Sequence, residues 1–141
     1  MVKMEPIIKM WYDFLAEGKL MGKRCPECGA VMFPPVPVCG KCSCMDLEWT
    51  EMSGEGEIHS LTYSPMGVYP FNDEPCLSGW GKLKEGMPFN SVIVNPPAGG
   101  ADELRERLRQ GPVPAKLVIT KLDDTISFPY FEIQEENNES V

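Results

Sequence analysis

Four cysteines stand in two matched pairs near the beginning of the chain. Cys25, Cys28, Cys39 and Cys42 form the pattern C-x2-C-x10-C-x2-C. A two-residue gap lets both thiolates of a pair turn toward one ion, and two such pairs supply the four sulfurs of a tetrahedral site. Two disulfides would use the same residues, but nothing else in the sequence is typical of a secreted protein. We therefore predict that these four residues bind a structural zinc ion.

The other two cysteines have different interpretations. Cys44 follows Cys42 by two residues, so a Cys42 and Cys44 ligand pair is an alternative. A one-residue gap closes a ligand loop poorly, which favours Cys39 and Cys42. Cys76 lies at the expected start of a strand. A lone cysteine that enters an apolar run is typical of packing, and the sequence shows no base or cation beside it that would activate a nucleophile.

The sequence indicates no independent catalyst. Its single histidine, His59, falls in an expected strand and is interpreted as a surface or barrel residue rather than a general base. The chain contains no Gly-x-Ser-x-Gly elbow, no phosphate-binding glycine loop with lysine and no histidine-pair metal motif. Zinc bound by four thiolates has no open position at which water could be activated. We therefore predict no catalytic residue on this chain.

Composition argues against some classes of partner and favours one cellular compartment. The chain has 141 residues and a net charge of −8, which suits one domain or two small modules. Nucleic-acid binding requires a basic surface, and the acidic balance argues against it. No apolar segment approaches the roughly 18 residues of a membrane span, and residues 1–17 do not resemble a signal peptide. Free thiols and a tetrathiolate site suit a reducing cytoplasm.

An aromatic helix is expected before the cysteines. Between Glu5 and Glu17, apolar side chains including Trp11, Phe14 and Leu15 recur at the spacing of one helical face. One interpretation is that this face packs on its own domain. The other is that Trp11, Phe14 and Leu15 bind a partner protein, because the small metal-binding region offers little core to cover.

The rest of the chain predicts a mainly β protein. Short strands are expected at Val31–Phe33, Asp46–Trp49, Ile58–Tyr63, Leu77–Leu83, Ser91–Val94, Ala115–Leu122 and Thr125–Ile133, with a helix at Ala101–Gln110. The last five strands, with a helix between the third and the fourth, have the outline of an OB-fold barrel. We expect a helical arm over 1–22, a zinc ribbon over 23–52, an OB-fold over 53–134 and a disordered acidic tail over 135–141.

The motifs, taken in order, resemble a known family. These are Trp11–Leu15, Arg24–Gly29, Phe33–Cys39, Leu47–Trp49, Ser53–Gly56 and Phe128–Phe131. Together they resemble the OB-fold/zinc-ribbon acyl-CoA-associated proteins, long known as a domain of unknown function. The resemblance implies a rubredoxin-like zinc ribbon followed by an OB-fold.

The same resemblance implies a role in an assembly. Proteins of this kind are accessory subunits of thiolase-superfamily enzymes, and the partner carries the catalytic cysteine and histidine. The expected function is a non-catalytic subunit of a thiolase-like acyl-CoA complex, which can help to form the acyl-CoA site. The aromatic and proline-bearing segment from Tyr63 to Cys76 and the long link from Asn95 to Gly111 depart from the family pattern. The first departure suggests an aromatic acyl-CoA partner, such as a thiolase of benzoylsuccinyl-CoA breakdown.

Two other functions fit parts of the sequence. A stand-alone rubredoxin-like electron carrier would bind iron with the same four cysteines, because such ligand pairs suit either metal. A nucleic-acid-binding protein would use the OB-fold, since OB barrels often bind single strands. The charge of −8 argues against the second function.

Overall fold

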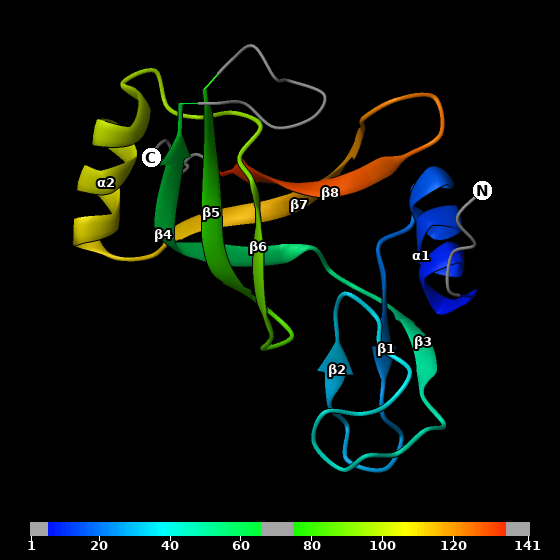
Figure 1. Cartoon of the computed structure of the whole chain (residues 1–141). Coiled ribbons are helices and arrows are strands. Elements are labelled where there is room, and N and C mark those ends of the chain that lie inside the picture. The colour runs from blue at the N-terminus through cyan, green and yellow to red at the C-terminus, as the bar shows by residue number, and fades with distance from the viewer. Residues whose placement is uncertain (1–5, 66–74, 135–141) are drawn as a thin grey trace, which may run out of the picture. The chain divides into compact units, whose positions relative to one another are not determined.

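The structure is a computed structural model that describes residues 6–65 and 75–134. Its elements, in chain order, are α1 (Pro6–Ala16), β1 (Met21–Arg24), β2 (Val31–Met32), β3 (Glu48–Glu51), β4 (Glu55–Ser64), β5 (Cys76–Leu83), β6 (Pro88–Val92), α2 (Gly100–Gln110), β7 (Val113–Lys121) and β8 (Ser127–Ile133) (Figure 1). None of the helices in these residues is long and apolar enough to cross a membrane.

The chain divides into two compact units. The first, here called the ribbon unit, contains the chain up to Ser53 together with Glu85–Met87 and Ile119–Phe128. The second, here called the barrel unit, contains Gly54–Lys84, Pro88–Val118 and the chain from Pro129 onward. The ribbon unit thus includes short segments from the range 53–134, and the predicted domain bounds stay predictions.

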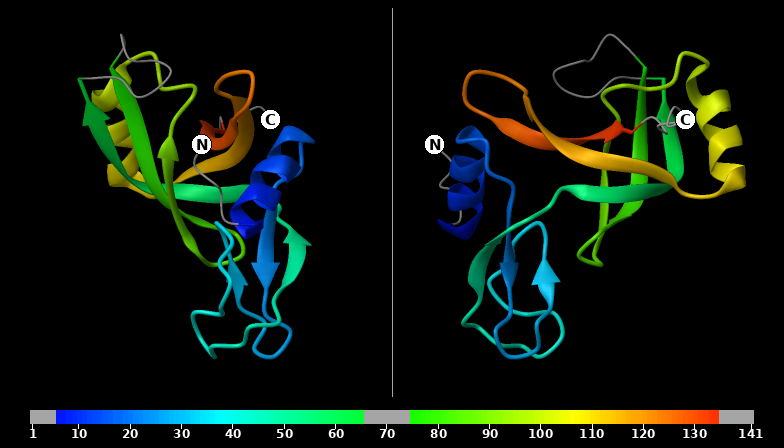
Figure 2. Two further views of the ribbon diagram at one scale, coloured as in Figure 1. Left: turned by 45° about the vertical axis from the view of Figure 1, so that its right-hand side comes forward. Right: turned by 180° about the vertical axis from the view of Figure 1, so that it is seen from behind.

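A small antiparallel sheet forms the centre of the ribbon unit. Strand β1 lies between β2 and β3, as both views of Figure 2 show. The sequence analysis did not predict β1, because Met21–Arg24 has no alternation of apolar and polar residues. Gly22 allows the close approach at this position, since a Cβ there would lie 2.8 Å from the carbonyl oxygen of Met32.

Helix α1 packs inside the ribbon unit. Trp11 and Leu15 are 2% and 1% exposed, so the face predicted from the apolar spacing is buried. The Trp11 indole N–H donates a hydrogen bond to the carbonyl oxygen of Met21 at 2.9 Å, and its ring meets those of Phe33 and Phe128 edge-on at 5.7 and 5.8 Å. Burial of this aromatic face favours the interpretation in which the helix packs on its own domain.

The barrel unit has the topology of an OB-fold. Its sheet has the order β6-β5-β4-β7-β8, and a parallel bridge between Ile93 and Phe131 brings the chain after β6 against β8. Strand β4 is long enough to pair with β7 through Glu55–Ile58 and with β5 from Gly56 to Ser64. The sheet is therefore nearly closed on itself, and the predicted mainly β fold of a zinc ribbon plus an OB-like barrel is confirmed.

Two glycines allow the barrel to curl. A Cβ on Gly81 would lie 2.0 Å from the carbonyl oxygen of Glu57, and one on Gly79 would lie 3.1 Å from the side chain of Ile58. The register between β4 and β5 also shifts between Ile58 and Ser60. The bulge and the close backbone approach let this strand curve, as a nearly closed barrel requires.

Helix α2 lies beside β4 in the barrel unit (Figures 1 and 2). Leu104 is fully buried, and the glycines at 99–100 and 111 limit the helix to the span predicted from sequence, within one residue. The link before the helix is fixed by Asn95, whose side chain exchanges hydrogen bonds with the backbone of Ile133 at 2.8 and 3.1 Å. The barrel thus presents α2 in a defined position.

Two predictions fall outside the described residues. The residues that suggest an aromatic partner, Met66, Tyr69 and Phe71, lie within 66–74, and the predicted acidic tail covers 135–141. Both stay predictions.

Candidate metal centre

The four predicted ligands meet at one point of the ribbon unit. Their sulfur atoms all lie within 4.8 Å of one another. Cys25 and Cys42 approach to 3.5 Å between sulfurs, and Cys28 and Cys39 to 3.6 Å. A sulfur tetrahedron around zinc, with bonds of about 2.3 Å, has edges of about 3.8 Å, whereas a disulfide requires about 2.05 Å. The donor set therefore fits a tetrahedral metal ion and does not form disulfides.

Each ligand pair is held by the backbone around it. In the first pair, the Gly29 amide donates to the Cys25 carbonyl and the Cys25 amide to the Ala30 carbonyl, both at 2.8 Å. Gly29 turns the chain after Cys28 with a φ of 78°, a conformation that glycine adopts at little cost because it has no Cβ. Strands β1 and β2 flank this turn, so their pairing fixes the first two sulfurs.

The second pair is held by a compact loop. The Cys39 amide donates to the Cys44 carbonyl at 2.9 Å, and the Ser43 amide to the Cys39 carbonyl at 3.1 Å. The Lys41 amide points at the Cys39 sulfur at 3.3 Å. The backbone of this loop turns with a positive φ of 64° at Ser43.

Electrostatics favour a cation among these sulfurs. The backbone amides of Cys42 and Lys41 lower the pKa of the Cys39 thiol to about 6. The amide of Cys44 also lowers the pKa of Cys42, but the neighbouring Cys25 sulfur and burial outweigh it, and the pKa rises to about 12. The cluster therefore favours deprotonation of one thiol and disfavours deprotonation of a second, because two thiolates this close repel each other. A divalent cation removes that conflict by binding all four as thiolates.

The resulting site is closed. Cys25 and Cys39 are 0% and 2% exposed, while Cys28 and Cys42 lie on the surface. With four protein sulfurs on a tetrahedral ion, no position is open to water or substrate. The four cysteines form the metal centre of a zinc ribbon, and the role that this geometry supports is structural.

The remaining candidates are not members of the four-sulfur group. Cys44 is half-buried and its sulfur accepts the Asp46 amide at 3.4 Å, so it is not part of the cluster. Cys76 is half-buried at the start of β5. His59 is exposed on β4, where its Nε2 lies 3.0 Å from Glu57 and its ring 6.1 Å from that of Trp80. The structure does not bring these three residues together.

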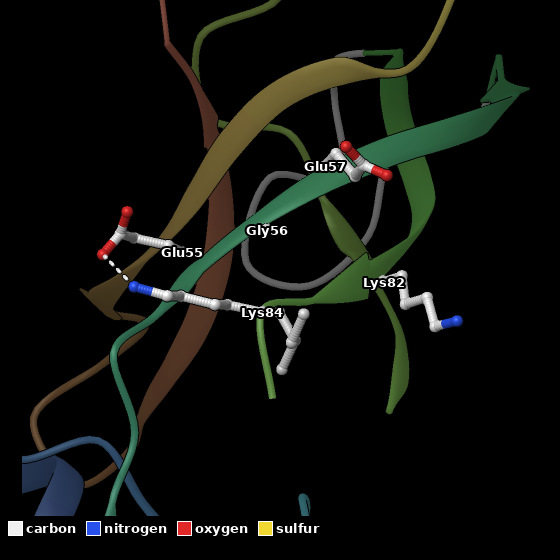
Figure 3. A pocket seen from close by; sticks show the side chains of 6 residues that line it. Glu55, Gly56, Glu57, Lys82 and Lys84 are labelled. Atoms are coloured by element: carbon white, nitrogen blue, oxygen red, sulfur yellow. Dashed lines mark ion pairs between the residues drawn. The ribbon is translucent and has the colours of Figure 1, made fainter. Parts of the chain in front are cut away.

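A surface hollow of the barrel unit lies over Gly56 and Leu83 and measures about 300 Å³ (Figure 3). Its rim carries both signs of charge, and Lys84 lies 3.9 Å from Glu55. The side chains of Glu57 and Lys82 point away from that pair in Figure 3. The rim charges do not converge on one point, so the hollow has no arrangement that would orient a reacting group.

The comparisons with known proteins agree with the metal centre. Residues 13–43 match the family described as ChsH2, rubredoxin-like zinc ribbon domain. A DUF35 domain-containing scaffold protein of Methanocaldococcus jannaschii is 31% identical over 93 residues, which are 63% of this chain and 64% of that protein. The chain thus spans 64% of the length of this relative. A scaffold protein of the same description from Methanothermobacter thermautotrophicus is 31% identical over 65% of this chain and 71% of that protein.

The chain belongs to the DUF35 family. Solved structures support the DUF35 fold along nearly the whole chain. The structure titled Ltp2-ChsH2(DUF35) aldolase has a TM-score of 0.74 at 20% identity and covers 94% of this chain and 98% of that one. A DUF35 protein of unknown function from Sulfolobus solfataricus has a TM-score of 0.56 at 15% identity, and the match covers 92% of this chain and 86% of that one. The family predicted from the cysteine and proline motifs is confirmed.

Proposed function

We propose that this DUF35 chain is a non-catalytic subunit that assembles with a thiolase-like catalytic subunit of an acyl-CoA enzyme. The observation that carries the proposal is the closed four-sulfur centre in a chain of the DUF35 family. Such a site stabilises a fold and leaves no coordination position for chemistry. The two relatives described as scaffold proteins, and an aldolase whose title joins Ltp2 to a DUF35 chain, support an assembly role.

The catalytic groups would then come from the partner. Carbon–carbon bond cleavage or formation beside a thioester requires a nucleophile and an acid–base group within hydrogen-bond reach of each other. In the described residues, His59 and the two cysteines outside the metal centre stand on different elements and are not grouped. This chain would hold the complex together and can contribute to the wall of the acyl-CoA site. A benzoylsuccinyl-CoA thiolase is the specific partner that we propose to test first.

The α1 helix remains our candidate contact with that partner, in a restricted form. Trp11 and Leu15 are covered by their own unit, so they would act by holding the helix in place. Phe14 is half-buried, and its ring meets Trp49 edge-on at 5.1 Å. Phe14 is therefore the member of the predicted trio that can still be reached by another protein.

The test is co-expression of the chain with the thiolase-like subunit, followed by light scattering on a sizing column. We expect one complex that contains both chains. When coenzyme A is added, this complex should cleave a carbon–carbon bond of the acyl-CoA substrate. Phe14→Ala should weaken the assembly by about 2 kcal/mol, the cost of an aromatic interface anchor, while zinc content stays unchanged. Separate elution of the two wild-type chains, with full activity of the catalytic subunit alone, would refute the proposal.

One observation favours a second candidate. The matched domain is rubredoxin-like, and four thiolates also bind iron in electron carriers. Visible absorbance and metal analysis of the purified chain separate the two functions. A colourless protein with one zinc per chain supports the assembly role, and a red protein with one iron per chain supports electron transfer.

A further inference from the structure

A second hollow, on the barrel unit, lies between α2 and β4. It measures about 380 Å³ and is lined from β4 by His59, Leu61 and Tyr63 and from α2 by Arg105, Leu108 and Arg109. We call it the α2–β4 groove. The groove is shallow and open to solvent, so its side chains can be reached from outside. From this groove we propose that the chain binds a small organic phosphate that carries an aromatic ring, of the nucleoside diphosphate kind. The nucleotide end of coenzyme A is a ligand of this class, so the inference rests on the proposed function and deepens it by naming the part of this chain that such a group would contact.

The arginines give the groove its affinity for phosphate. Arg105 and Arg109 are four residues apart on α2, so their side chains emerge on one face about 5–6 Å apart at Cβ. That separation suits two adjacent phosphoryl groups, and planar guanidinium groups bind phosphate oxygens in pairs. His59, on the opposite wall, adds a third group that carries positive charge when protonated.

These arginines can exchange their present partners for a ligand. Arg105 pairs with Asp102 at 2.7 Å and Arg109 with Glu106 at 3.4 Å, in each case through Nη1 and within the same helix. Their side chains are 49% and 68% exposed, and ion pairs at such exposure contribute little to stability because water screens them. Each guanidinium has five N–H donors, so these ion pairs leave donors for a phosphate.

The rest of the groove suits a flat ring. Leu61 and Leu108 are half-buried in the lining, and Tyr63 is 51% exposed at its edge. An exposed tyrosine beside apolar side chains is a surface on which an aromatic ring can stack, as bases do in nucleic-acid-binding proteins. The ligand therefore combines a phosphate end at α2 with a ring over Tyr63.

The experiment uses the full zinc-bound chain and maps backbone amide shifts by NMR while ADP is added. We expect saturable shifts confined to α2 and the residues of β4 that line the groove, with Tyr63 among them. Pyrophosphate alone should shift α2 and leave Tyr63 unchanged, and adenosine alone should bind more weakly than either. Citrate tests whether any polyanion suffices. Shifts spread over all basic residues, or equal binding of citrate and ADP, would overturn the proposal.

Matched variants test the role of the arginines. Arg105→Gln and Arg109→Gln should each weaken ADP binding by about tenfold, the loss expected for one charge-assisted hydrogen bond. Arg107→Gln removes the same charge from the same helix, but Arg107 pairs with Glu103 at 2.6 Å and does not line the groove. It should bind ADP as the wild type does. Equal losses in all three variants would reveal a diffuse charge effect and overturn the proposal.

Failure of this proposal can be distinguished from failure of the proposed function. Zinc content and amide dispersion of each variant verify that the chain is folded. A chain that assembles with its catalytic subunit and shows no saturable ADP shifts contradicts the groove ligand alone. A chain that binds ADP in the groove and fails to assemble contradicts the scaffold role alone.

Discussion

The ribbon unit and the barrel unit are stabilised in different ways. In the described residues, the buried apolar side chains of the ribbon unit, apart from two metal-binding cysteines, are Trp11, Leu15, Leu20, Phe33 and Met52. Those of the barrel unit are Ile58, Leu77, Leu83, Phe89, Ile93, Leu104, Val113, Ala115, Leu117, Tyr130, Phe131 and Ile133. A small core buries little apolar surface. Little stabilising free energy therefore remains after the entropy cost of ordering the chain is subtracted. The comparison indicates that the ribbon depends on its metal and the barrel on apolar burial.

The largest effect should follow the loss of a zinc ligand. Cys28→Ser removes one of four sulfurs, and structural zinc contributes about 10–16 kcal/mol to the folding of small ribbons. We expect the variant to lose zinc and the amide resonances of the ribbon to collapse, while those of the barrel keep their dispersion. Metal analysis and NMR measure both.

Cys44→Ser is the matched control for this change. Its sulfur lies outside the cluster, so the variant should keep one zinc per chain. If Cys28→Ser retained its metal and Cys44→Ser lost it, the assignment of ligands would be wrong.

The next effect should come from the aromatic core of the ribbon unit. Trp11→Ala removes the ring that meets Phe33 and Phe128 and the indole donor to Met21. Truncation of a buried tryptophan costs about 3–5 kcal/mol. Urea unfolding followed at ribbon resonances should show this loss, whereas Phe14→Ala, at a half-buried position, should lose less. Equal stability of Trp11→Ala and wild type would mean that the helix is held by something other than its own unit.

A smaller effect is expected in the barrel unit. A Cβ on Gly81 would lie 2.0 Å from the Glu57 carbonyl oxygen, so Gly81→Ala forces β4 and β5 apart. Forced shifts of this kind cost about 1–3 kcal/mol. Thermal unfolding should show the loss at barrel resonances, with zinc content unchanged. Loss of zinc in this variant would contradict the separation of the two units.

The sequence predicted some of these features better than others. Cysteine spacing identified the metal centre because ligand geometry leaves few alternatives. Strand β1 was missed because its residues have no strand pattern of their own and are held by pairing with β2 and β3.

Packing between distant segments was also beyond the sequence. The apolar spacing of α1 predicted a buried face, but it could not decide whether Trp11 meets its own chain or a partner. That answer depends on Phe128, more than one hundred residues away in sequence. The α2–β4 groove was not predicted either, although the spacing of Arg105 and Arg109 was a visible signal.

The smallest effect concerns the start of α2. The Glu103 carboxylate accepts the Gly99 amide at 3.0 Å and the Arg107 guanidinium at 2.6 Å. The amide first, and then the arginine, lower the pKa of Glu103 below its ordinary 4.5. A lowered pKa in the folded state adds stability that is complete above the unfolded value and is lost as pH falls through the folded value.

Glu103→Gln should therefore lower the midpoint of thermal unfolding of the barrel slightly at pH 7. The difference from wild type should shrink as the pH falls below about 4.5. Glu106→Gln, on the same helix, removes an exposed pair at 3.4 Å and should change the midpoint less. A difference that grows in acid would contradict this account of the helix start.

The central claim is that the zinc ribbon and the barrel serve an assembly rather than a reaction of their own. The most direct test measures acyl-CoA cleavage by the thiolase-like subunit that we propose as the partner, in the absence and in the presence of this chain. The account predicts low activity of the catalytic subunit alone, none for this chain alone, and full activity when the two form a complex. Turnover by this chain alone, or activity of the catalytic subunit that the chain does not change, would contradict it.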